Sequence, residues 1–338
     1  MTVQTPAPST RAARPWLHRI SEQAPIVVLI LLCVGTALLQ PRFLSTVNLT
    51  NVLLQASVLG VIVIGMTYVI ISGGFDLSVG SVAALSGCAA TGVMVALVPG
   101  EAMLDGTNMG AMLVGMAAGV GLGLAFGVFN GMLVAYVGLN AFIATLGTMV
   151  LARGLVLLFT DARPITGDFG LPEAFITFGR GRFLGLPLIT WVPIVLLVVL
   201  AWVLHRTRFG LRIFAVGGGP EAAYLAGVDV RRVKAGAFAL GGALAGLAGV
   251  MLAARLQSGQ PTAGHFYELY AIAAVVLGGA SLYGGEGKLW RSMIGLMIIV
   301  VLSNSLNLLN VVSHWQEVSI GLVIIIAASI DRLRSRRR

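Results

Sequence analysis

Long apolar segments, separated by short polar ones, dominate this chain from end to end. An α-helix rises 1.5 Å per residue, so about 20 apolar residues cross the roughly 30 Å hydrocarbon core of a bilayer. The pattern predicts an all-α polytopic membrane protein with about ten transmembrane helices. The expected spans are 24–40, 52–72, 79–98, 110–137, 141–159, 184–204, 235–254, 271–283, 289–310 and 315–330.

The eighth expected span, 271–283, is short, and the distribution of basic residues tests whether it should be kept. With the N-terminus inside, sixteen Lys and Arg residues fall in inner segments and five in outer loops. Such a bias is the mark of cytoplasmic loops. Omitting the eighth span would move the tail "DRLRSRRR" outside and destroy the bias. We therefore expect both termini in the cytoplasm.

The domain organisation follows from these spans. We expect one transmembrane domain over 24–331, with its longest cytoplasmic loop at 205–234. A flexible cytoplasmic tail over 1–23 and a basic cytoplasmic tail over 332–338 would flank it.

Composition agrees with a membrane protein and excludes several other classes. The chain is 57% hydrophobic and 10% charged, whereas soluble domains carry about 25% charged residues. The net charge of +9 fits the inside bias and lacks the aromatic interleaving of a nucleic-acid surface. The chain has no zinc-type His or Cys spacing, no nucleotide-binding loop and no intramembrane cluster of His, Asp and Glu. We expect no bound metal or cofactor and no enzymatic activity.

An aspartate stands between two apolar spans, in "GGFDLSVGSVAALSG" (residues 73–87). An ionised Asp at the bilayer centre costs roughly 2.5–3.5 kcal/mol, so Asp76 needs compensation. Gly73 and Gly74 permit a sharp turn, after which Asp76 can cap the next helix with help from Ser78. Asp76 could also face a transport pathway, and the two roles are compatible.

A similar phrase, "GGASLYGG", occupies residues 278–285. Transporters often contain internal repeats with glycine-broken helices, so Gly278 and Gly279 are candidate hinges like Gly73 and Gly74. In a glycine-rich chain, chance similarity is an equal explanation. Both copies enter the membrane in the same sense, so the pair does not indicate an inverted repeat.

The loop at 205–234 contains a predicted short helix. Gly217, Gly218 and Gly219 break the chain, and Pro220 suits the first helical turn. Glu221 is favourable at that positive end, and Gly227 can end the helix in a left-handed cap. About two turns are unstable alone. The helix is thus either a docking element for a cytoplasmic partner or part of an ordinary connection.

The stretch "EAAYLAG" has the form E-A-A-x-x-x-G, which resembles the cytoplasmic coupling motif of permease subunits in bacterial ATP-binding-cassette (ABC) importers. The chain is similar more specifically to ribose-type permeases of monosaccharide importers, within the branched-chain and sugar permease superfamily. Further matching stretches extend over most of 50–330. They are "MTYVIISGGFDLSVGSVAALSG", "NAFIATLGTMVLARGLVLL", "AVGGGPEAAYLAGVDV" and "ALAGLAGVMLAARLQSGQPTAGHFYELYAIAAVVLGGASLYGGEGK".

The resemblance implies the membrane-spanning subunit of a sugar importer in the bacterial inner membrane. Its implied partners are a cytoplasmic subunit that holds ATP and Mg²⁺, a periplasmic sugar-binding protein, and a second permease copy, identical or homologous. Membrane lipid would surround them. The residues implied to couple to the ATP-binding subunit are Glu221, Ala222, Ala223 and Gly227. The alternatives are a related permease for branched-chain amino acids or nucleosides, and an ion-coupled carrier that uses Asp76.

Polar residues inside the spans are candidates for the translocation pathway. The resemblance implies that an arginine is typical at Arg153, which could bind backbone carbonyls or line the pathway. Asn304 and Asn307 share a helix face and could bind sugar hydroxyls or join helices. The complete set of pathway candidates is Asp76, Asn130, Arg153, Asn304 and Asn307.

Overall fold

The computed structural model describes residues 15–104 and 108–335, and its long elements are all helices. The helices are α1 (Pro15–Leu39), α2 (Thr46–Ile71), α3 (Val79–Leu97), α4 (Met109–Met132), α5 (Ala141–Thr160), α6 (Glu173–Arg180), α7 (Leu188–Arg206), α8 (Arg208–Gly218), α9 (Pro220–Leu225), α10 (Val230–Leu256), α11 (Tyr267–Leu277), α12 (Leu289–Leu308) and α13 (Ser313–Ser335). Short elements are the 3₁₀ turns η1 (Pro41–Leu44) and η2 (Gly100–Leu104), the π-helical turn η3 (Leu133–Val137), and the antiparallel strands β1 (Arg182–Phe183) and β2 (Leu186–Pro187).

Seven of the described helices are long and apolar enough to cross a membrane, namely α2, α3, α4 with η3, α5, α7, α10 and α12. Shorter apolar helices occupy Gln23–Leu39 within α1 and all of α11. The prediction of an all-α polytopic protein is confirmed. Helix α1 begins at Pro15, so it extends into the segment 1–23 that was expected to be a tail; residues 1–14 and 336–338 of the two tails lie outside the described chain.

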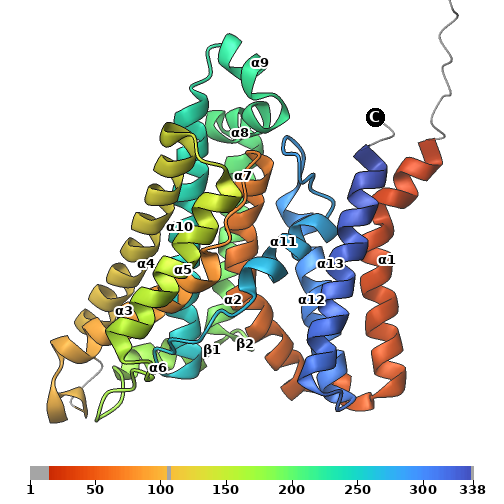
Figure 1. The fold of residues 1–338 in the computed structure, drawn as a ribbon. Helices are drawn as coiled ribbons and strands as arrows, with labels where there is room; N and C mark the ends of the chain where they lie inside the picture. The colour runs from red at the N-terminus through yellow and green to blue at the C-terminus, as the bar shows by residue number, and fades with distance from the viewer. Residues whose placement is uncertain (1–14, 105–107, 336–338) are drawn as a thin grey trace, which may run out of the picture.

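The long helices run between two ends of the molecule (Figure 1). Helices α8 and α9 lie at one end, here called the α9 end. Helix α6 and the β1–β2 hairpin lie at the other, the α6 end. Helices α1, α12 and α13 form a group beside the remaining helices, and α2 and α11 connect the two groups (Figure 1).

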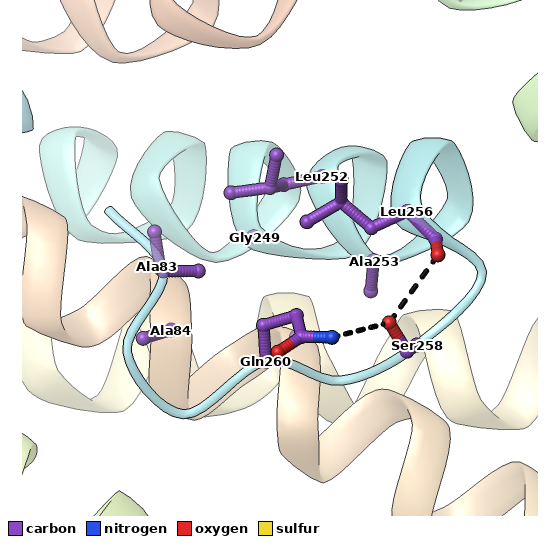
Figure 2. A pocket seen from close by; sticks show the side chains of 10 residues that line it. Ala83, Ala84, Gly249, Leu252, Ala253, Leu256, Ser258 and Gln260 are labelled. Carbon is purple, nitrogen blue, oxygen red and sulfur yellow. Dashed lines mark hydrogen bonds between the residues drawn. The ribbon is translucent and has the colours of Figure 1, made fainter. Parts of the chain in front are cut away.

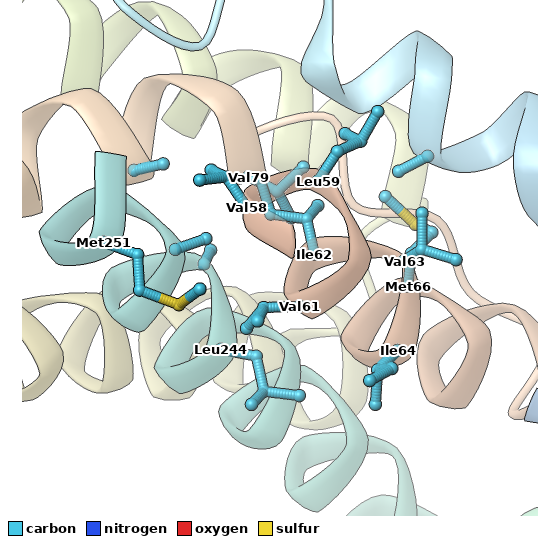
Figure 3. Close-up of a cluster of buried hydrophobic side chains, with 14 of the residues drawn as sticks. Val58, Leu59, Val61, Ile62, Val63, Ile64, Met66, Val79, Leu244 and Met251 are labelled. Atoms are coloured by element: carbon cyan, nitrogen blue, oxygen red, sulfur yellow. The ribbon is translucent and has the colours of Figure 1, made fainter. Parts of the chain in front are cut away.

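Helix α2 is the centre of the core. It packs against α10, α7, α12 and α11, and its residues Val61, Val63 and Ile64 are completely buried. Figure 3 shows Val61 beside Leu244 of α10, whereas Val63 and Ile64 lie on another side of α2. A helix that is apolar all round belongs in the interior, which explains why α2 shows no amphipathic pattern in the sequence.

Helices α4 and α10 approach each other through glycines spaced four residues apart. A Cβ on Gly123 would lie 2.5 Å from the Gly242 oxygen and 2.6 Å from the Gly246 Cα, so no side chain fits there. Small residues at this spacing let membrane helices pack backbone to backbone. We call this contact the α4–α10 seam; it comprises Gly119, Gly123, Gly127 and Gly131 of α4 against Ala235, Gly242 and Gly246 of α10.

The two similar stretches, which begin at Gly73 and Gly278, end α2 and α11. Their equivalent positions are shifted by one residue relative to the alignment of Gly73 with Gly278 that the sequence suggests. The backbone amides of Gly73 and Gly279 each donate to the carbonyl three residues earlier in the chain. The amide of the residue after each glycine donates to the carbonyl five residues earlier. Both glycines have positive φ, 79° and 86°. This is the Schellman ending of a helix. The structural equivalent of Gly73 is therefore Gly279, and the alignment of Gly73 with Gly278 was wrong.

The other two hinge candidates serve close packing. A Cβ on Gly74 would lie 3.0 Å from the Phe238 ring, and one on Gly278 would lie 2.6 Å from the Arg291 carbonyl. Neither has positive φ. They pack the broken ends of α2 and α11 against neighbouring helices.

Candidate functional site

The loop predicted at 205–234 folds into α8, α9 and the start of α10. Pro220 is the first residue of α9, and Gly219 precedes it as the N-cap. Gly227 has φ of 81°, and its amide donates to the Tyr224 carbonyl. The short helix with a left-handed end is confirmed, although α9 has only six residues.

Helix α9 exposes a mixed polar and apolar surface. Glu221 and Ala222 are exposed, whereas Ala223 is buried and packs inward. Tyr224 is 72% and Leu225 85% exposed. These two side chains occupy the variable positions of the E-A-A-x-x-x-G form, which is why the motif alone did not indicate them. These exposed apolar side chains on an otherwise polar turn make α9 a candidate contact surface.

A groove of about 820 Å³ lies beneath α9. Glu221 and Tyr224 line it from α9, and Asp229 and Arg231 line it from the start of α10. Asp229 also caps α10 through the Arg232 amide (3.0 Å) and forms an ion pair with the Arg232 side chain (3.0 Å). The α9 end therefore presents a short helix above a charged groove.

Helix α8 was not predicted from the sequence. It buries Gly210, Ile213 and Val216 on one face, a spacing of three residues that is helical. Gly210 must be glycine, since a Cβ there would overlap the Leu204 carbonyl. The apolar spacing was the available signal, but the glycine run at 217–219 favoured a loop. Helix α8 packs against the membrane helices α2, α7 and α10 and so anchors the N-terminal end of α9 to them.

Asp76 and Asn130 come together in a buried polar cluster at the start of α3. The Asp76 Oδ1 atom accepts the Ser78 amide (2.9 Å) and the Ser78 hydroxyl (2.6 Å). Asn130 Nδ2 donates to Ser78 Oγ (2.9 Å) and approaches the Asp76 carboxylate at 3.4 and 3.5 Å. The N-cap residue is Ser78, not Asp76, so Asp76 shapes the turn that precedes the helix.

This polar cluster is buried in the protein interior. Asp76 is 1% exposed and Asn130 is fully buried. Burial raises the pKa of the Asp76 carboxyl in the connection 72–78, and the hydrogen bonds from Ser78 and Asn130 offset only part of that rise. The Asn130 Oδ1 atom is buried and has no hydrogen-bond partner among the described residues.

Arg153 of α5 holds the segment that follows α10. Its Nη1 atom donates to the carbonyls of Pro261 (2.5 Å) and Ala263 (3.1 Å), and Nη2 also donates to Ala263 (3.1 Å). The interpretation of Arg153 as a partner of backbone carbonyls is confirmed. This segment then reaches Gly80 of α3, where a Cβ would overlap the Gly264 carbonyl and lie 2.5 Å from the Glu268 carboxylate.

A small cavity between α3 and α10 lies beside the same segment (Figure 2). Ser258 Oγ donates to the Leu256 carbonyl (3.3 Å), and Gln260 Nε2 donates to Ser258 Oγ (2.8 Å) at its rim. The cavity holds about 10 Å³, which is room for about one water. It is far too small for a sugar in this conformation.

Asn304 joins helices at the α6 end. It exchanges two amide hydrogen bonds with Asn48 of α2, at 3.0 and 2.8 Å. Asn307 instead accepts from Gln316 of α13 at 2.9 Å. The role of these asparagines in joining helices is confirmed. The five pathway candidates thus fall into three separate places, and only Asp76 and Asn130 touch each other.

Within 15–104 and 108–335, no three His, Cys, Asp or Glu side chains gather closely enough to hold a metal ion.

Comparison with known proteins gives consistent matches over nearly the whole chain. The family model described as "Branched-chain amino acid transport system / permease component" matches residues 48–328. A ribose import permease protein of Bacillus subtilis is 46% identical over 92% of this chain and 92% of its own length. That of Escherichia coli K12 is 41% identical over 98% and 99%, and the E. coli D-allose transport system permease protein 36% over 92% and 91%. No solved structure matches the chain.

Proposed function

This chain belongs to the family of branched-chain amino acid transport system permease components, and we propose that it carries a ribose-like monosaccharide across the bacterial inner membrane as the permease subunit of an ABC importer. The sugar permeases that support this cargo match the chain over at least 91% of their own lengths. The broader family description names amino acids, so a branched-chain amino acid is the competing cargo.

The proposed topology has ten crossings with both ends in the cytoplasm. The start of α1 and the end of α13 lie at the α9 end (Figure 1). Arg163, Arg180 and Arg182 are three of the five basic residues expected in outer loops, and they lie near α6 and β1 at the opposite end. Helix α11, with 11 residues, would complete the set as a half-length crossing, since eleven residues rise only about 16 Å.

Impermeant labelling of cysteine variants tests this topology. In a chain with Cys33 and Cys88 replaced, Leu184→Cys in the β1–β2 turn should react with an impermeant maleimide on intact cells. Leu225→Cys on α9 should react only after the cells are opened. Both residues are highly exposed, at 76% and 85%. The reverse pattern would contradict the orientation.

Helix α9 and the groove beneath it form the proposed docking surface for the ATP-binding subunit. The observation that carries this assignment is the exposure of Tyr224 and Leu225 beside Glu221. ATP and Mg²⁺ would bind on that partner subunit. A periplasmic sugar-binding protein would dock at the α6 end, and a second permease copy would complete the pathway.

Partner capture is the decisive experiment. The tagged chain, solubilised gently, should co-purify with an ATP-binding subunit, and Glu221→Lys or Gly227→Arg should remove that subunit and abolish uptake. Glu173→Lys is the matched control, because it makes the same charge change in the first turn of the short helix α6 at the other end. It should retain the subunit.

Uptake assays then separate the candidate cargoes. Labelled ribose, allose and leucine are offered to cells that express the complete importer. Uptake of a sugar that depends on Glu221 supports the proposal, whereas leucine uptake alone would assign the chain to the competing cargo. Retention of the ATP-binding subunit and normal uptake by both coupling variants would contradict the docking surface.

A further inference from the structure

Three breaks in the helices meet at the α9 end. They are the connection after α2, the last turn of α8, and the connection between α11 and α12 (Figure 1). Glycines form the contacts between them, and no side chain lies between the backbones. We call this contact the glycine junction; its members are Gly73, Gly217, Gly218, Gly284 and Gly285.

One carbonyl, that of Ile71, is the centre of the glycine junction. It belongs to the last residue of α2 and accepts the Gly285 amide at 2.9 Å. A Cβ on Gly217 would overlap this same oxygen and lie 2.5 Å from the Gly285 nitrogen. The end of α8 therefore packs against both atoms of the hydrogen bond that joins α2 to the α11–α12 connection.

Gly284 and Gly285 make the other close backbone contacts of the glycine junction. Gly284 and Gly285 have φ of 88° and 74°, which glycine adopts without strain. A Cβ on Gly284 would lie 2.8 Å from the Gly217 oxygen and 3.0 Å from the Gly73 Cα. One on Gly285 would lie 2.6 Å from the Gly218 Cα. Each of the three segments thus contacts both of the others.

Backbone contacts of this kind are stiff. A side chain between two segments can change rotamer and absorb a shift, but two packed backbones must move together or separate. Only Gly219 lies between Gly218 and the first residue of α9. The connection after Gly73 leads to Asp76 and α3, and the connection after Gly285 leads to α12, so the junction reaches both helix groups.

We propose that the glycine junction transmits the displacement of α9 to α2 and to the α11–α12 connection, so that the state of the ATP-binding subunit sets the opening of the pathway. This inference rests on the function proposed above and names the part of the chain that performs the coupling. Asp76 and Ser78 lie on the connection between α2 and α3 that follows the junction.

Gly217→Ala is the variant that tests the proposal. Gly217 lies in α8 without positive φ, so alanine favours the helix itself and acts only by separating α8 from Ile71 and Gly285. In proteoliposomes that contain the complete importer, we expect the ATP-binding subunit to bind and hydrolyse ATP. Sugar uptake per ATP should fall about tenfold, a typical coupling effect.

Two variants control for trivial causes. Gly121→Ala adds the same methyl group inside helix α4, where nothing lies within 4 Å of the Cβ position, and should keep the normal uptake per ATP. Gly249→Ala creates a similar overlap, with the Ala83 carbonyl of α3, away from the junction. It should reduce yield and thermal stability but keep the normal ratio. The proposal is overturned if Gly217→Ala keeps the ratio, or if Gly249→Ala loses it equally.

A second measurement needs no glycine variant and so remains informative if Gly217→Ala fails to assemble. Spin labels at Leu211 of α8 and Tyr283 of the α11–α12 connection, 61% and 59% exposed, report their separation with and without ATP. A third label at Leu184 supplies a reference. The Leu211–Tyr283 distance should stay constant while the distance from Leu211 to Leu184 changes.

The outcomes distinguish the inference from the proposed function. Separation of Leu211 from Tyr283 on ATP binding, or no change in either distance, would overturn the junction while sugar uptake by the wild type still supported the importer. A wild-type complex that takes up no sugar would instead contradict the function itself.

Discussion

The α4–α10 seam and the glycine junction are both built from glycines, yet they differ in what surrounds them. In the seam every glycine lies inside a continuous helix, and four contacts repeat along two antiparallel helices. At the junction the glycines stand where helices stop, and three have positive φ. The seam therefore holds two helices together along their length. The junction instead holds the end of α2, the end of α8 and the α11–α12 connection together at one place.

The same residue type therefore stabilises helix packing at the seam and, in the coupling that we propose, joins moving segments at the junction. Separating α4 from α10 requires breaking all the backbone contacts of the seam at once, because they repeat along the same two helices. Moving the junction requires only that three short segments shift together. We expect seam variants to lose folded protein and junction variants to lose coupling.

The largest effect is expected at the seam. Gly123→Leu would force a side chain against the Gly242 oxygen and the Gly246 Cα, which should cost about 3 kcal/mol of stability. Gly121→Leu on the same helix is the control, since nothing lies within 4 Å of its Cβ position. Yield and thermal unfolding in detergent measure both. Equal stability of the two variants would contradict the stabilising role of the seam.

The next effect separates strain from contact at the junction. Gly285→Ala combines positive φ with a Cβ 2.6 Å from Gly218, and we expect it to cost about 2 kcal/mol and to reduce uptake per ATP. Gly185→Ala has a similar φ of 81° with open space around it and carries strain alone. If both variants transport normally per folded molecule, the junction contact does not matter for coupling.

A smaller effect is expected at Asp76. Asp76→Asn keeps an acceptor for the Ser78 amide, and Asn130 can turn its unpaired Oδ1 toward the new amide. We expect a cost of about 1 kcal/mol and nearly normal sugar uptake. Thermal unfolding and uptake at several pH values check this. A well-folded Asp76→Asn protein without uptake would instead favour an ion-coupled carrier.

The smallest effect is expected far from the junction, at Asn48 and Asn304. Replacing both by Leu removes two amide hydrogen bonds between α2 and α12, worth about 0.6 kcal/mol each in membrane proteins. Only the unfolding temperature should change. A changed KM for the sugar would place this pair on the pathway.

The sequence predicted most of the helices and the coupling helix for direct reasons. Apolar length sets a membrane helix, and Pro220, Glu221 and Gly227 specify a short helix by local backbone chemistry. The same reasoning missed α8, because its apolar spacing ends in three glycines that also suit a loop. It also placed Gly278 opposite Gly73, because equal letters do not reveal which glycine carries the positive φ.

What the sequence alone determined are properties that depend on neighbouring residues: helix length, helix ends, the basic bias toward one side, and the E-A-A-x-x-x-G form. Only the tertiary structure decided which polar residues meet, because Asp76 and Asn130 are separated by 54 residues and Arg153 finds its carbonyls 108 residues away. It alone brought Gly73, Gly217 and Gly285 together. Contacts between distant segments depend on how whole helices pack, and no local pattern encodes that geometry.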